Sequence, residues 1–138
     1  MKCILVEQQV AYSAMEYLRN GATYPARRII VTEPDGFHIT PDDKAIFVGP
    51  WSMEKDMVVS GGSINEEALQ NYPEAEREKV REEMKKRFEK RRRDFTPKIV
   101  KEIDVPDGLV ELARLKYNAQ RTLEAHLEEI KLIAEQQT

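Results

Sequence analysis

The sequence predicts an α+β protein with a small mixed β-sheet and one helix in the N-terminal half and two long charged α-helices, separated by a short strand, in the C-terminal half. Two patterns predict this: short apolar and β-branched runs divided by turn residues come first, and long, densely charged helical patterns follow. A length of 138 residues is about one domain's worth, with room for one modest core. We therefore expect a single domain, with residues 1–62 as the mixed-sheet region and residues 63–138 as the long-helix region.

The first elements are a strand and a helix. Residues 2–7 form a continuous apolar run of strand length, and apolar residues then recur at helical spacing between residues 11 and 18. Asn20 and Gly21 follow as a C-cap. Because this helix joins the first strand to a second β-branched run at residues 28–33, we expect the first two strands to be parallel.

Short turns connect the strands that follow. A Pro-Asp-Gly turn after Glu33 leads into a strand at residues 37–40, and a second turn leads into a strand at residues 44–49. Residues 57–59 are a candidate for a short edge strand. Strands joined by such short turns are antiparallel, so the sheet as a whole is expected to be mixed.

The second half of the chain begins with helix signals. Ser63 and Glu66 have the spacing of a capping box and predict a short helix, which Pro73 ends. A longer helix is predicted from Glu74, with acidic residues early and basic residues late, an order that complements the helix macrodipole. Its apolar residues form a narrow stripe of Val80, Met84 and Phe88, so it can bury only one edge.

A strand near residues 98–105 precedes the last helix, which is predicted over about residues 106–136. A helix of some 30 residues spans roughly 45 Å, which is longer than a domain of this size needs. Apolar residues recur along it at alternating spacings of three and four, the pattern of a coiled-coil-like seam. We therefore expect a homo-oligomer whose interface contains Leu112, Ala119, Leu123, His126 and Ile130.

Composition excludes several classes of protein. The chain is 41% hydrophobic and 34% charged with a formal net charge of −3, which is typical of a soluble protein with much exposed helix surface. No segment resembles a signal peptide or approaches the roughly 20 apolar residues of a membrane span, so no membrane contact is expected. The single cysteine, Cys3, excludes an intrachain disulfide and favours a reducing, cytoplasmic location. We expect Cys3 to be buried in a strand.

No catalytic or metal-ligand motif rises above chance. His38 and His126 have no Cys, Asp or Glu neighbours at metal-site spacing. Residues 60–63 lack the lysine and hydroxyl pair of a P-loop, and a dinucleotide-binding fingerprint is not present either. We therefore expect no metal and no cofactor, and we favour a non-enzymatic role.

Three features are candidates for contact with an anionic ligand. The cluster of cations at residues 85–93 suits phosphate groups, residues 60–63 offer backbone amides at the start of a helix, and the one tryptophan follows a strand. The candidate ligand-binding residues are Trp51, Ser60, Gly61, Gly62, Lys86, Arg87, Lys90 and Arg91. The structural alternatives are a solvated helix end for the cluster, a flexible linker for residues 60–63, and a place at the edge of the core for the tryptophan.

For function, we favour a binding or assembly protein that homo-oligomerises through its last helix, since heptad seams and polar helices are devices for association. Small chains of this build are frequent among phage and mobile-element accessory or structural proteins. The first alternative is a nucleotide- or nucleic-acid-binding module, sequestering or regulatory, that uses residues 85–93. The second is a small enzyme near Glu7, Glu33 and Trp51, because the carboxyl ends of parallel strands gather at one edge of a sheet.

Overall fold

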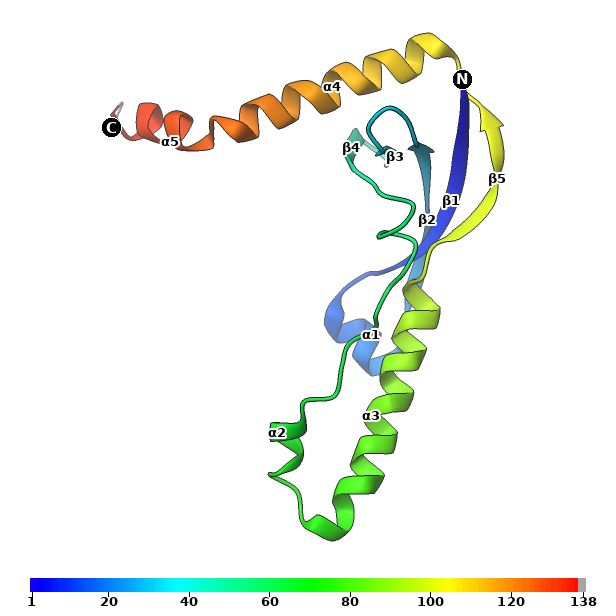
Figure 1. Ribbon diagram of the computed structural model, residues 1–138, viewed down its shortest axis with the longest axis vertical. Coiled ribbons are helices and arrows are strands. Elements are labelled where there is room, and N and C mark those ends of the chain that lie inside the picture. Colours follow the sequence, from blue (N-terminus) through cyan, green and yellow to red (C-terminus); the bar gives the residue numbers. More distant parts are fainter. Residues whose placement is uncertain (137–138) are drawn as a thin grey trace. The chain divides into compact units, whose positions relative to one another are not determined.

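The protein has an α+β fold, as the sequence predicts. The computed structural model describes residues 1–136, of which 46% are helical and 26% lie in strands, so neither class dominates. The strands form one five-stranded antiparallel sheet in the order β4-β3-β2-β1-β5 (Figure 1). The strands are β1 (Lys2–Ala11), β2 (Thr23–Val31), β3 (Phe37–Pro41), β4 (Ile46–Pro50) and β5 (Lys98–Asp104). The helices within residues 1–136 are α1 (Ala14–Asn20), α2 (Glu66–Leu69), α3 (Glu74–Phe95), α4 (Asp107–Ala125) and α5 (Leu127–Gln136).

Contacts divide the chain into two compact units. Unit 1 contains Met1–Leu5, Arg28–Trp51 and the chain from Lys101 onward, and unit 2 contains Val6–Arg27 and Ser52–Val100. The boundary between the sheet region and the long-helix region expected near residue 62 is therefore not where the contacts divide, because each unit takes segments from both halves of the sequence. That the chain forms a single domain stays a prediction.

The sheet is antiparallel, so the expectation of a mixed sheet with parallel first strands was wrong. Segment lengths explain the difference. β1 has 10 residues and spans roughly 33 Å, whereas the 7 residues of α1 span only about 10.5 Å. A helix that short cannot carry the chain back along β1 to start a parallel neighbour. The chain therefore returns directly through β2, which runs in the opposite direction.

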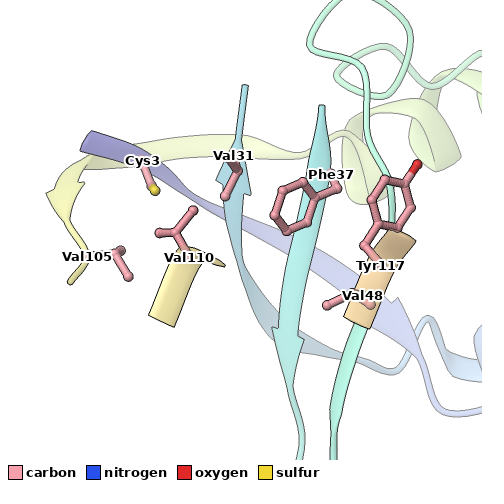
Figure 2. Packing of buried hydrophobic residues seen from close by; sticks show 7 residues of the cluster. All are labelled: Cys3, Val31, Phe37, Val48, Val105, Val110 and Tyr117. Atoms are coloured by element: carbon pink, nitrogen blue, oxygen red, sulfur yellow. The ribbon is translucent and has the colours of Figure 1, made fainter. Parts of the chain in front are cut away.

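Unit 1 holds the main apolar core. β3 pairs with β2 through Val31 opposite Phe37 and with β4 through Phe37 opposite Pro50. Figure 2 shows side chains of these strands meeting side chains of α4, with the rings of Phe37 and Tyr117 side by side. The buried cluster consists of Cys3, Val31, Phe37, Val48, Val105, Val110 and Tyr117. Cys3 is thus buried in a strand as expected, and this burial raises the pKa of its thiol above the ordinary value.

The last helix is interrupted at one residue. The sequence predicts a continuous helix to residue 136, but the structure divides it into α4 and α5 at His126, whose φ is −106° and ψ is 20°. The His126 N–H donates to the carbonyl of Leu123 at 3.0 Å, so the final turn of α4 tightens to a three-residue step. α5 then begins at the next residue, Leu127.

In unit 2, the helix termini follow local capping chemistry. α1 begins at the Ser13 hydroxyl, which accepts from the Glu16 N–H, and ends at Gly21 with a φ of 69°, as the sequence predicts. The cap of α2 is Asn65, whose Oδ1 accepts from two backbone N–H groups, so the Ser63 capping box was wrong. Asx side chains cap as well as serine does, and Asn65 stands closer to the helix. Residues 57–59 form no strand.

Candidate interaction surfaces

One face of α4 is held on the core of unit 1. The Tyr117 ring stacks on Phe37 with centroids 5.3 Å apart, and the Arg114 guanidinium lies 5.2 Å from the Phe37 centroid. Arg114 Nη2 also donates to the Glu33 carbonyl at 2.8 Å. Arg121 lies over the outer side of Tyr117, 5.3 Å from its centroid. These contacts fix the rotation of α4 about its own axis.

The opposite face of α4 is apolar and exposed. At 100° per residue, Leu112 and Leu123 lie about 200° and about 220° around the helix from the buried Val110. Leu109, Leu112, Leu115 and Leu123 expose 57%, 64%, 64% and 62% of their surface. Large leucines this exposed on one side of a helix mark an interaction surface more often than a solvated one. The surface was predicted from spacing, and its five named interface residues, Leu112, Ala119, Leu123, His126 and Ile130, are all exposed.

The exposed surface continues beyond the sheet. Every residue of 118–136 is exposed, and Figure 1 shows the end of α4 and α5 extending past the strands of unit 1. α5 adds Leu127, Ile130 and Ile133 to this face, and these three expose between 43% and 59% of their surface. Residues 112–122 carry three basic and no acidic side chains, whereas residues 123–136 carry four acidic side chains and one basic. The exposed face is apolar along its length, and two of the three basic side chains, Arg114 and Arg121, lie on the core-packed face of α4 instead. We call the exposed face the α4–α5 seam.

A second candidate surface lies in unit 2, where α1 contacts the basic half of α3. Lys90 Nζ lies 2.6 Å from Asp94 Oδ2, and the Tyr17 hydroxyl donates to the same oxygen at 2.8 Å. The bond from Lys90, then that from Tyr17, holds the pKa of Asp94 below its ordinary value, and the Asp94 bond raises the pKa of Lys90. Lys90 also lies 5.2 Å from the Tyr17 centroid. These three side chains fasten α1 to α3.

Beside this fastening lies a groove of about 440 Å³. Its lining residues are Tyr17, Leu18, Asn20, Gly21, Arg87, Lys90 and Arg91. Three of the predicted ligand-binding residues, Arg87, Lys90 and Arg91, therefore lie together. Lys86 does not line the groove, because one step along a helix turns its side chain about 100° away from Arg87. The contribution of α1 was missed, since nothing in its sequence signals that it faces α3.

The segment with Ser60, Gly61 and Gly62 lies against the same helix. A side chain at Gly61 would meet the Phe88 carbonyl, and one at Gly62 would come within 3.0 Å of the Phe88 ring. Both glycines have positive φ, 75° and 114°, which other residues adopt only with strain. Glycine at these two positions permits the segment to pack closely onto α3.

Trp51 lies beneath Arg28 in unit 1. Its ring is only 6% exposed, the Arg28 guanidinium carbon stands 5.8 Å from its centroid, and His38 meets it edge-on at 6.3 Å. The Gly36 carbonyl accepts from the Trp51 N–H at 3.1 Å, so the backbones of these two residues lie close together. Trp51 Nε1 and Arg28 Nε are buried with no hydrogen-bond partner within residues 1–136. Too little of the ring is open for a base to stack on it.

The enzyme alternative loses its geometrical premise. It grouped Glu7, Glu33 and Trp51 at the carboxyl ends of parallel strands, but neighbouring strands of this sheet are antiparallel. Glu7 forms an ion pair with Arg27 at 3.2 Å. No group of three or more possible metal-ligating side chains occurs within residues 1–136, and no helix there has the length and apolarity to cross a membrane.

Comparison with known proteins adds no family. The chain matches no protein-family model, no curated protein and no solved structure. The interpretation of these surfaces therefore rests on their own chemistry.

Proposed function

We propose that this chain is a non-enzymatic assembly protein that self-associates through the α4–α5 seam. One observation carries the proposal: the face of α4 opposite the core-packed face is a row of leucines more than half exposed. Because Tyr117 and Arg114 hold the other face, α4 cannot rotate to bury this row within its own chain. A surface of this kind needs a partner helix.

The occupant we propose for the seam is a second copy of the chain in the antiparallel orientation. In one antiparallel register the apolar positions face one another: Leu109 faces Ile133 of the second copy, Leu112 faces Ile130, and Ala119 faces Leu123. The paired segments are residues 109–125 of α4 and all of α5, roughly 25 Å and 15 Å of helix on the two sides of His126.

The oligomeric state tests the proposal. Sedimentation equilibrium over a wide concentration range is expected to show a reversible dimer for the wild-type chain. Leu112→Glu with Leu123→Glu places carboxylates in the seam and is expected to give a monomer with an unchanged circular dichroism spectrum. Leu132→Glu is the matched control, since Leu132 is 57% exposed yet lies about 200° around α5 from Ile130. A wild-type monomer at every concentration, or a dimer that survives the double variant, would contradict the proposal.

Orientation is tested by cross-linking. In the antiparallel register, Leu112→Cys and Ile130→Cys variants oxidise to a disulfide-linked dimer only when the two proteins are mixed. In a parallel pair, each variant cross-links with itself. The native Cys3 is buried and provides the background control in the wild-type chain. Self-linking of the separate variants would overturn the antiparallel register and leave association through the seam intact.

A further inference from the structure

The basic half of α3 carries charge that the protein does not neutralise. Seven cations occupy residues 85–93, and only Lys90 among them forms an ion pair within residues 1–136. A spacing of four residues would also allow the pairs Glu82–Lys86, Glu83–Arg87 and Glu89–Arg93, but none of these three is formed. Clustered cations repel one another and attract anions, so an anionic partner bound here would relieve the repulsion.

Two of these cations face a groove. Lys90 is occupied by Asp94, whereas Arg87 and Arg91 line the 440 Å³ groove beside α1 with no carboxylate partner within residues 1–136. Arg91 additionally stands 6.0 Å from the Phe88 centroid. The Lys90–Asp94–Tyr17 contacts set the spacing of α1 and α3, and the two arginines provide the free positive charge.

The groove has an apolar continuation. A second hollow of about 390 Å³ shares Tyr17, Leu18 and Arg91 with the first and is otherwise lined by Ala11, Ser13, Ala14 and Phe95. Leu18 is 68% exposed and Met15 on the same helix is also 68% exposed, so apolar surface lies open beside the arginines. The aromatic part of the lining comes from Tyr17 and Phe95, whose ring centroids lie 4.7 Å apart.

We propose that this furrow, formed by α1 and the C-terminal half of α3, binds single-stranded nucleic acid. Arginines beside open apolar and aromatic surface match a phosphate and an adjoining base, the two repeating parts of a strand. Each hollow is about the size of a small-molecule site and takes a nucleotide, whereas a duplex is too wide to enter. An acidic peptide would match the charge but would leave the aromatic surface without a role.

Binding of a fluorescently labelled oligothymidylate, followed by anisotropy, tests the proposal. Arg87→Gln with Arg91→Gln is expected to weaken binding at least about tenfold and to reduce the slope of log K against log salt by about 1.4, the effect of two lost phosphate contacts on a single strand. Lys79→Gln removes a charge from the acidic half of the same helix and should leave both quantities nearly unchanged. Circular dichroism melting confirms that the variants fold.

One further variant tests the apolar contact, and three competitors separate the possible ligands. Leu18→Ala is expected to weaken binding without changing the salt slope, because it removes apolar contact and no charge. Free thymidine monophosphate, duplex DNA and polyglutamate are offered as competitors, and each is expected to compete far less well than the unlabelled strand. No binding of the strand, equal loss in Lys79→Gln, or stronger competition by any of the three would overturn the proposal. The seam variants keep their affinity per chain, so failure here is distinct from failure of self-association.

Discussion

Asp94 is the residue on which the attachment of α1 to α3 depends. It accepts from both Lys90 and Tyr17, and its side chain is about a quarter exposed, so the bonds are partly sheltered from water. Lys90 and Asp94 stand four residues apart on one helix, a spacing that allows an ion pair. The part played by Tyr17, from a helix 77 residues earlier in the chain, depends on tertiary structure.

Asp94→Asn is expected to lower the free energy of unfolding by about 1 kcal/mol at neutral pH, because a charge-assisted pair becomes a weaker neutral one. The folded-state pKa of Asp94 lies below the ordinary value of 3.8, so its contribution is present above that value and is lost as the pH falls further. Urea denaturation of wild type and variant should therefore show a difference in the free energy of unfolding at neutral pH. This difference should narrow at about pH 3.

Glu89→Gln is the matched control for this measurement. Glu89 lies on the same helix and forms no ion pair within residues 1–136, so its substitution should change stability little at either pH. If the difference in unfolding free energy between wild type and Asp94→Asn stays the same in acid, the carboxylate charge is not what stabilises this contact.

At the scale of elements, α4 has two apolar faces, one packed on the core and one exposed. Val110 is fully buried against the strands of unit 1, whereas Leu112, two residues on, is 64% exposed. Periodicity predicts the exposed row that contains Leu112, but it did not identify Val110 and Tyr117 as the face that the sheet covers. The stacking of Tyr117 on Phe37 decides this.

Val110→Ala and Leu112→Ala separate the two faces. Val110→Ala is expected to destabilise the chain by about 2 kcal/mol, because it removes buried methyl groups and leaves a cavity. Leu112→Ala, measured in protein dilute enough to be monomeric, is expected to change stability by less than about 0.5 kcal/mol. Chemical denaturation of both variants measures the difference. An equal loss for the two would contradict the rotation of α4 described above.

At the scale of the whole molecule, self-association links stability to concentration. A dimer that forms only from folded chains stabilises the folded state by mass action, so the wild-type Tm should rise as the protein concentration rises. In the Leu112→Glu, Leu123→Glu variant this dependence should disappear. Differential scanning calorimetry at several concentrations makes the comparison. A wild-type Tm that does not depend on concentration would indicate that the seam is not occupied by a second copy.

The two proposed surfaces lie in different units and use different chemistry. The seam belongs to unit 1 and is mainly apolar, whereas the furrow belongs to unit 2 and is basic. A net charge of −3 for the whole chain conceals this, because charge averaged over a sequence says nothing about where it gathers.

The sequence by itself determined the α+β class, the order of the main strands and helices, the burial of Cys3 and the exposed heptad-like row on the last helix. These follow from local pattern, since periodicity, turns and most caps act over a few residues. It did not determine strand direction, the break at His126, or the meeting of Arg28 with Trp51 and of α1 with α3. Only the tertiary structure decided these, because they depend on segment lengths in three dimensions and on which distant side chains fill the space beside one another.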